Sequence, residues 1–459
     1  MIFALVAGAC SGDKPARQVD RDRSVWGYSG DGIARGVAAD GDGNWLITGN
    51  FRGTTRIAGR ELRSAGRSDA FLAKFDPAGR LLWVKRFGGP RGGDAGIDVD
   101  TDTDGNVIVT GQFTGTVDFG DGVVADATGG ATDLVVTKFA PSGRPVWTRV
   151  VAGDGAEFGD EVATAADGAV VVTGVTASPR LVVQPTGVVA GAHGSTDVLV
   201  VVYEPDGRLR WTQRVGGPAE DIGRGMEVDP SGAVLLVGEF TRSITFAGES
   251  HPGFGGLDMF VSKWTPEGRL SWAWVAGGPG LESARAVDSD GQGNVYVGGR
   301  WQGRFALQGV ELVSERGSRD MFLVKLDPAG QRQWIRSIGG ARYDEGVELE
   351  VNFEGDVYVA GLFSGSATIG GTDATRRSTV GSSHGQTDEL IASLDSDGLV
   401  RGTTTGGGSG KEVNYAIGLA PGGAVASVGT TEGGARFGSL VLDRKVGWYL
   451  ATRPTMDSW

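Results

Sequence analysis

Acidic residues recur at one position along this chain. Six of them stand eleven residues before a recurring glycine, and a seventh, in the first copy of the pattern, is displaced by one residue. The set is Asp31, Asp94, Glu157, Asp221, Glu282, Asp344 and Glu412. Carboxylates that converge on one cleft focus a negative field and attract cations, whereas buried acids that recur in a fold usually accept backbone N–H groups. The pattern predicts either a ring that binds a ligand or cation, or a structural staple repeated in every unit.

Three alternating aspartates, Asp100, Asp102 and Asp104, stand directly before Gly105. This spacing begins like a calcium-binding loop, which supplies oxygen ligands at alternate positions. Such a loop needs a later acid, but Ile108 and Gly111 occupy the positions where one would be required. Asp and Gly are also ordinary turn residues. We therefore predict a turn here and no metal site.

The histidines do not form a catalytic set. The chain has three, His193, His251 and His384, all in segments that vary among the copies of the pattern. His193 and His384 occupy the same offset in copies three apart, so we expect them on nearly opposite sides of the molecule. Without a paired acid and base or a nucleophile beside a base, the sequence predicts a protein that is not an enzyme and that uses no cofactor.

Tryptophans recur at one offset, which indicates packing between neighbouring units with the indole N–H bonded to a nearby carbonyl. The recurring residues are Trp83, Trp147, Trp211, Trp272 and Trp334. Others break this register, and among them Trp301 opens a variable segment just after Gly299. We therefore predict Trp301 as the candidate residue for stacking against a ligand.

These residues belong to seven copies of a pattern of about 62 residues. Each copy has a turn glycine and a second glycine six residues later: Gly43/Gly49, Gly105/Gly111, Gly168/Gly174, Gly232/Gly238, Gly293/Gly299, Gly355/Gly361 and Gly423/Gly429. The residues between the two glycines are mostly apolar and β-branched, which is typical of a buried strand. An apolar segment before the turn, a segment opened by aspartate, and a tryptophan segment after a Pro-x-Gly turn predict three more strands in each copy.

Four short strands per copy, no linkers and no helical periodicity predict an all-β, seven-bladed β-propeller of four-stranded antiparallel blades. The chain enters with a fourth-strand pattern around Trp26 and leaves just after a third strand near Trp448. We expect these N-terminal and C-terminal strands to pair and close the ring, so that no edge is left to open. Trp459 is the alternative source of the closing strand.

The repeat resembles a known family. The string Asp-x-x-Gly-Asn-Val-Tyr-Val-x-Gly, followed by Gly-x-x-Asp-x-Phe-x-x-Lys-x-Asp-Pro-x-Gly-x-x-x-Trp and a Gly-Gly pair such as Gly88-Gly89, is similar to the bacterial seven-bladed β-propeller repeat called SBBP. The resemblance extends over most of the chain. It implies an extracytoplasmic repeat protein and no common catalytic residues. The sixth copy departs most, because Leu399 to Gly402 replace its tryptophan strand, and we expect a loose outer edge there.

Charge and the single cysteine bear on partners and location. The formal net charge of −13 and the absence of a basic stripe argue against nucleic acid as a partner. Cys10 follows a short apolar run ending in Ala7-Gly8-Ala9 and precedes a charged stretch. It looks like the lipidated residue of a bacterial lipoprotein, although ordinary signal cleavage would also suit this run. We expect residues 1–23 to be a signal segment and tether, and residues 24–459 to be the propeller.

Function is predicted only in outline. Segments that vary on a fixed scaffold usually carry recognition. We therefore expect an exported, monomeric, lipid-anchored propeller in the cell envelope, in the outer membrane or at the cell surface, that recognises a protein or an extracellular polymer through its loops. The alternatives are a secreted protein, an envelope-assembly lipoprotein that pairs with partners by strand addition, and, least favoured, a hydrolase or lyase with its site at the channel mouth.

Overall fold

The computed structural model describes residues 18–20, 25–30, 32–127, 131–190, 194–314, 317–371, 378–383, 386–408, 411–431, 435–437, 440–441 and 447–453. Cys10, Asp31, His193, His384 and Trp459 lie outside these ranges, and Glu412 is described only by its backbone. Among the described residues, no helix has the length and apolar character needed to cross a bilayer.

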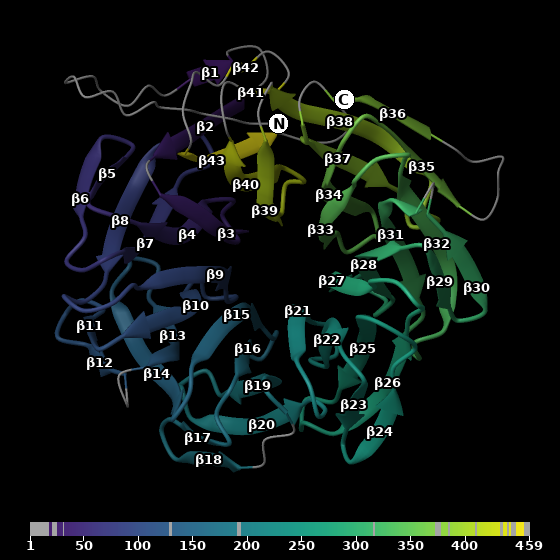
Figure 1. Cartoon of the computed structure of the whole chain (residues 1–459). Coiled ribbons are helices and arrows are strands. Elements are labelled where there is room, and N and C mark those ends of the chain that lie inside the picture. Colours follow the sequence, from purple (N-terminus) through teal and green to yellow (C-terminus); the bar gives the residue numbers. More distant parts are fainter. Residues whose placement is uncertain are drawn as a thin grey trace.

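The fold is an all-β propeller, as predicted. Within the described residues, seven sheets each contain four antiparallel strands that succeed one another from the axis of the ring to its rim (Figure 1). Blade 1 has β3 (Ile33–Ala39), β4 (Trp45–Phe51), β7 (Asp69–Phe75) and β8 (Leu81–Phe87). Blade 2 has β9 (Ala95–Thr101), β10 (Val107–Thr114), β13 (Thr132–Phe139) and β14 (Pro145–Gly153). Blade 3 has β15 (Glu157–Thr164), β16 (Val170–Thr176), β19 (Asp197–Tyr203) and β20 (Leu209–Val215).

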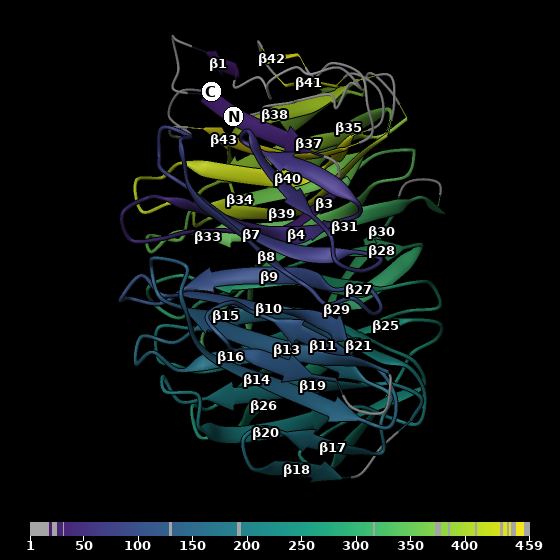
Figure 2. The same cartoon turned by 90° about the vertical axis from the view of Figure 1, so that its left-hand side faces the viewer.

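The remaining blades repeat this order. Blade 4 has β21 (Asp221–Val228), β22 (Val234–Phe240), β25 (Asp258–Trp264) and β26 (Leu270–Ala276). Blade 5 has β27 (Ser283–Ser289), β28 (Val295–Gln302), β31 (Arg319–Leu326) and β32 (Arg332–Gly339). Blade 6 has β33 (Glu345–Val351), β34 (Val357–Phe363), β37 (Asp388–Leu394) and β38 (Val400–Gly408). Blade 7 has β39 (Glu412–Leu419), β40 (Val425–Thr431), β43 (Gly447–Arg453) and β2 (Val25–Gly30). Seen from the side, the strands run along the ring axis (Figure 2).

Strands from the two ends of the chain share blade 7. β2, which contains Trp26, pairs antiparallel with β43, with Gly27 opposite Ala451 and Gly30 opposite Trp448. A further strand, β1 (Gln18–Asp20), pairs with β2 although the sequence assigned it to the tether. The outer strand of blade 6 is also formed, because β38 pairs with β37 and with β41 (Ala435–Phe437). The expectation of a loose edge there is wrong.

Between its second and third strands, each blade sends out a hairpin that reaches the outer strand of the preceding blade. The hairpins are β5 (Thr54–Ile57) with β6 (Arg60–Arg63), β11 (Thr116–Asp118) with β12 (Val124–Asp126), β17 (Arg180–Val183) with β18 (Gly187–Ala190), β23 (Ser243–Phe246) with β24 (Glu249–Pro252), β29 (Arg304–Leu307) with β30 (Val310–Val313), β35 (Ser366–Gly371) with β36 (Ser378–Ser382), and β41 with β42 (Leu440–Val441). β17 pairs with β14 and β35 with β32. These hairpins form an outer belt around the ring (Figure 1).

The Gly-Gly pairs of the sequence are explained by this belt. A β-carbon on Gly216 would overlap the Asp197 carboxylate, which opens the third strand of the same blade. A β-carbon on Gly217 would overlap the carbonyl of Ser243, in the hairpin of the next blade. Both positions therefore need glycine because other atoms approach the backbone closely.

The recurring tryptophans join neighbouring blades as predicted. Trp211 Nε1 donates to the carbonyl of Pro266 in the next blade at 2.8 Å, and Trp147 Nε1 donates to that of Pro205 at 3.0 Å. Gly268 of the same Pro-x-Gly turn lies against the Trp211 ring and has a left-handed backbone conformation with a φ of 78°. The turn glycine thus serves both the backbone angle and the contact with the ring.

The apolar core lies between blades and not in one central cluster. One cluster combines Leu46 and Leu72 of blade 1 with Val107 and Val135 of blade 2, and equivalent clusters fill other junctions. Burying such side chains is the main favourable contribution to folding. Each blade is therefore stabilised by its neighbours, and the axis is left to polar residues.

Candidate functional site

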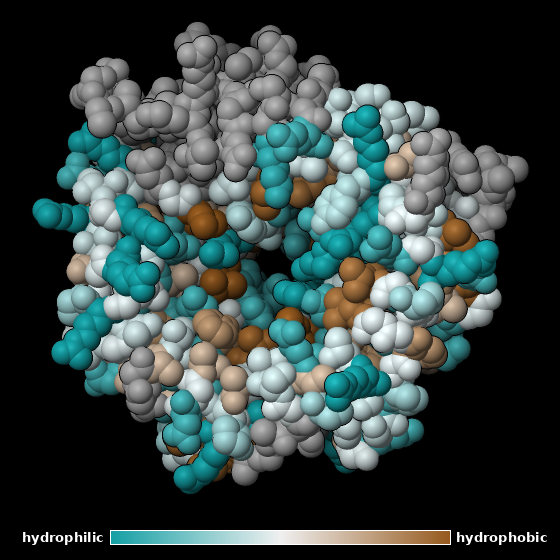
Figure 3. Space-filling view, in the orientation of Figure 1, coloured by the Kyte–Doolittle hydropathy of each residue, from teal (hydrophilic) through white to brown (hydrophobic). Residues whose placement is uncertain are grey.

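The first strands of the blades line a central channel. The cavity has a volume of about 310 Å³, and residues of β3, β9, β15, β21, β27, β33 and β39 form its wall. Hydrophilic residues gather beside the opening at the centre of the face in Figure 3. The first strand of each blade is therefore the innermost one.

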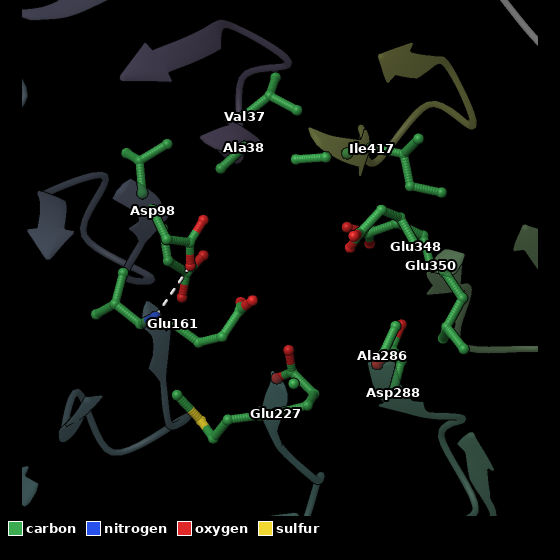
Figure 4. A pocket seen from close by; sticks show the side chains of 18 of the residues that line it. Val37, Ala38, Asp98, Glu161, Glu227, Ala286, Asp288, Glu348, Glu350 and Ile417 are labelled. Carbon is green, nitrogen blue, oxygen red and sulfur yellow. Dashed lines mark hydrogen bonds between the residues drawn. The ribbon is translucent and has the colours of Figure 1, made fainter. Parts of the chain in front are cut away.

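Eight acidic residues line this channel: Asp98, Asp100, Asp160, Glu161, Glu227, Asp288, Glu348 and Glu350. Figure 4 labels Asp98, Glu161, Glu227, Asp288, Glu348 and Glu350, which come from different sides of the ring and surround a common space. Most stand seven or five residues before the turn glycine, where some other copies have glycine or alanine, such as Gly36 and Ala38. Because alternate residues of a strand point to the same face, acids at these two positions both face the axis.

Some channel carboxylates also bind the neighbouring blade. Asp98 Oδ2 accepts the backbone N–H of Val162 at 2.9 Å, and Asp288 Oδ2 accepts that of Val351 at 2.5 Å. Asp100 Oδ2 accepts the hydroxyl of Thr164 at 2.8 Å. These bonds join successive first strands around the axis.

Positive charge in the channel is scarce. Arg35 and Arg285 are the basic residues of the described wall, and the Arg35 guanidinium donates to Asn50 Oδ1. Burial, together with Arg300 and Arg224, lowers the pKa of Arg285 to about 10. Eight carboxyl groups therefore face two guanidinium groups.

Burial changes the acidity of the channel wall. Burial raises the pKa of Asp98, Asp160 and Asp288 to about 7, that of Asp100 to about 6, and that of Glu348 to about 8. Burial and neighbouring carboxylates raise the pKa of Glu161, Glu227 and Glu350 well above the ordinary value. Like charges and loss of hydration both favour the neutral acid. The channel consequently exchanges protons near neutral pH and carries a negative potential at higher pH.

The acids predicted from the sequence lie elsewhere. The described side chains, Asp94, Glu157, Asp221, Glu282 and Asp344, are buried at the starts of the first strands and are absent from the channel wall. Asp94 accepts backbone N–H groups of Gly89 and Thr114, and Asp344 accepts those of Gly340 and Ser364. This arrangement matches the structural alternative predicted above, in which each carboxylate holds two loops together by accepting their backbone N–H groups. Burial raises the pKa of Asp94 to about 6 and that of Asp221, Glu282 and Asp344 to about 7.

Trp301 does not present its ring to a ligand, so that hypothesis is wrong. It is 1% exposed and packs beside Phe305 and Phe322. The reason is that β28 continues past Gly299 to Gln302, and the hairpin β29–β30 then folds over the ring. The first residues of the variable segment still belong to strand β28. A recognition surface must therefore lie later in the segment or elsewhere.

The aspartate-rich turn is held by protein groups. Asp102 Oδ1 accepts the backbone N–H groups of Asp104 and Asn106, and Asp102 Oδ2 lies 2.7 Å from Lys138 Nζ. The same lysine of the third strand pairs with the turn aspartate in other blades, as in Lys263 with Asp229 at 2.6 Å. Within the described part of the chain, no cluster of three His, Cys, Asp or Glu side chains is placed to hold a metal ion.

A second surface lies on the loop face, which we define as the face where successive blades are joined. At several junctions a residue just before the third strand pairs with one just before the next first strand. Three of these pairs consist of small or polar residues, namely Ser68 with Gly93, Thr196 with Glu220 and Thr387 with Lys411. The junction of blades 4 and 5 instead pairs Leu257 with Leu281, which is 40% exposed.

Other exposed rings adjoin these leucines. Phe254, 58% exposed, donates its backbone N–H to Asp258, as Ala65 donates to Asp69 in blade 1. At the next junction, Tyr343 is 42% exposed and lies under the Arg319 guanidinium, 4.8 Å from its centre. We call Phe254, Leu257, Leu281, Arg319 and Tyr343 the loop-face row. The sequence analysis missed it, although comparison of the junction residues among copies would have found it.

Comparison with known proteins identifies relatives of low similarity. No protein-family model matches the chain. An uncharacterized WD repeat-containing protein L264 of Acanthamoeba polyphaga mimivirus is 21% identical over 68% of this chain and 27% of its own length. The regulatory protein FlaEY of Caulobacter vibrioides is 24% identical over 57% of this chain and 24% of its own length. The chain thus spans about a quarter of the curated relatives it matches.

Solved structures with a similar arrangement include enzymes. The polysaccharide lyase Uly1 has 11% identity and a TM-score of 0.45, covering 92% of this chain and 90% of its own. A puromycin hydrolase mutant has 11% identity and a TM-score of 0.38, covering 88% and 59%. Because these structural neighbours include enzymes, the expectation that the chain is not an enzyme is withdrawn. At these similarities they assign no reaction or substrate to this chain.

Proposed function

We propose that this chain is an exported, lipid-anchored propeller that binds a protein or a cell-surface polymer through its loop face. The observation that supports it is the loop-face row. Exposed Phe254, Leu281 and Tyr343 lie at two successive junctions, whereas the junction pairs Ser68–Gly93, Thr196–Glu220 and Thr387–Lys411 are small or polar. Aromatic residues and arginine are enriched at the centres of binding interfaces.

Export and anchoring are supported by sequence only. The apolar run before Cys10 resembles a lipoprotein signal, and the repeat resembles the extracytoplasmic SBBP family. In this proposal the Cys10 thiol carries the lipid and the propeller lies in the envelope or at the cell surface. A secreted form would follow if the run were cleaved without lipidation.

A photo-crosslinking residue at position 281 tests the binding role. In the cells that produce the protein, we expect Leu281→benzoylphenylalanine to give a discrete crosslinked product upon irradiation. The matched control is Leu82, 50% exposed on the outer strand β8. Equal products from both positions, or none from position 281, would contradict recognition through the loop face.

Metabolic labelling tests the anchor. We expect the full chain to incorporate a fatty-acid label and to enter the detergent phase, and Cys10→Ser to lose both properties. A wild-type chain that stays in the aqueous phase without label would remove the anchor from the proposal, and the crosslinking result would stand independently.

Strand addition is a second candidate, favoured by the outer belt. β18 is the last strand of a six-stranded sheet, and Val182 and Val188 lie opposite each other on this hairpin at 51% and 56% exposure. An edge strand with exposed apolar residues suits pairing with an extended partner. A proline at position 188 should abolish binding of such a partner and leave crosslinking at position 281 unchanged.

A further inference from the structure

The loop-face row is continuous across blade 5. Gly280, next to Leu281, approaches the carbonyl of Gln302 so closely that a β-carbon would overlap it. Gln302 is paired with Arg319 across β28 and β31. Arg319 in turn lies over the ring of Tyr343. An extended segment could therefore contact Leu281 and Tyr343 together.

Among the described residues, one end of the row has more basic than acidic groups. Arg300 and Arg319 share one carboxylate oxygen of Glu345, at 2.6 and 2.9 Å, and the Tyr343 hydroxyl also donates to it. Two guanidinium groups thus face one carboxylate. The Arg319 side chain is 20% exposed, and Arg342 beside Tyr343 is exposed. A second carboxylate, supplied from outside, would balance this cluster.

The other end of the row is aliphatic. Leu257 and Leu281 present branched side chains, and Phe254 adds one ring. Sugars bind most favourably to flat aromatic faces, whereas branched aliphatic groups pack against apolar peptide side chains. Aliphatic residues at one end and arginines at the other therefore favour a peptide over a glycan.

We infer that the loop-face row binds an extended peptide segment of a partner protein, with apolar side chains on Phe254, Leu257 and Leu281 and a carboxylate on Arg319 beside Tyr343. This inference rests on the proposed function and specifies the partner's chemistry. The partner segment carries apolar and acidic side chains within one continuous stretch. The aliphatic end provides the apolar surface that is buried when the peptide binds. The arginine end fixes which way round the peptide lies.

Selection from a displayed library of random twelve-residue peptides against the full chain provides the probe. We expect the enriched peptides to combine Leu, Ile or Phe with a nearby Asp or Glu. For a selected peptide, Leu281→Arg should raise Kd by about tenfold or more. Leu82→Arg, at a leucine of the outer strand β8 that is 50% exposed, is the matched control and should leave Kd unchanged. Equal thermal midpoints of the two variants show that both fold.

The carboxylate contact is tested by a double-mutant cycle. Arg319→Gln and a Glu→Gln change in the peptide should each weaken binding by about tenfold, and the combination should weaken it little further. If Leu281→Arg abolishes binding but the cycle shows no coupling, the acidic partner is refuted and the proposed loop-face function survives. If Leu281→Arg and Leu82→Arg behave alike, both the acidic partner and the proposed loop-face function fail. Enrichment of basic peptides, no enrichment, or binding of a uronate oligosaccharide that Leu281→Arg removes would each overturn the peptide assignment.

Discussion

Glu348 offers a direct test of the channel chemistry. Burial and Asp98 raise the pKa of this carboxyl from 4.5 to about 8, and Arg285 opposes the rise. An acid with a raised folded-state pKa contributes its full stability below its unfolded pKa and loses it as the pH rises through the folded value. Linkage gives a loss of about 4 kcal/mol between pH 5 and pH 9, and water in the channel reduces this to about 2 kcal/mol. Glu348→Gln should remove most of that pH dependence.

The assay is urea unfolding followed by tryptophan fluorescence at pH 5, 7 and 9. We expect the free energy of unfolding of the wild type to fall with pH, and that of Glu348→Gln to fall by about 2 kcal/mol less. Glu354→Gln, at an exposed turn residue, is the matched control and should follow the wild type. Parallel pH profiles for the wild type and Glu348→Gln would refute the reasoning that this carboxyl holds its proton in the folded state.

Three further predictions concern the repeated structural contacts and are measured by urea unfolding. Trp211→Ala removes the ring and its bond to Pro266, and should cost about 3 kcal/mol; a loss under about 1 kcal/mol would show that the docking contact is weak. Gly217→Ala should cost about 2 kcal/mol or more because its β-carbon overlaps the hairpin of the next blade, whereas Gly41→Ala, with open space around it, should cost little. Lys263→Ala should cost about 3 kcal/mol because it leaves Asp229 buried and unpaired, and the double change with Asp229→Ala should cost less than the sum.

The repeat predicted the blade well because each of its signals has a local cause. The Pro-x-Gly turn and the β-branched second strand depend on residues close in the sequence, and the tryptophan was predictable because its contact with the next blade recurs at one offset, as Trp211 shows. The acid eleven residues before the turn glycine was noticed because it recurs. The channel acids were missed because they vary among blades, and only alternation along the first strand reveals that Glu348 and Glu350 face the axis.

Contacts between blades could not be predicted from one copy of the repeat. The direction taken by the hairpin after the second strand depends on the outer strand of the preceding blade, which is distant in the sequence. Trp301 illustrates this, since its burial depends on Phe305 in the hairpin that folds over it. The row on the loop face likewise joins residues from two successive copies, Leu257 and Leu281.

The outer belt gives the ring a polarity. Because each hairpin covers the preceding blade, detaching blade 3 would strip β17 from β14 and leave the edge of blade 2 bare. The outer strand of blade 4, in contrast, would still be covered by the hairpin of blade 5. Mechanical or thermal unfolding should therefore spread around the ring in one direction, from a detached blade to the lower-numbered blades.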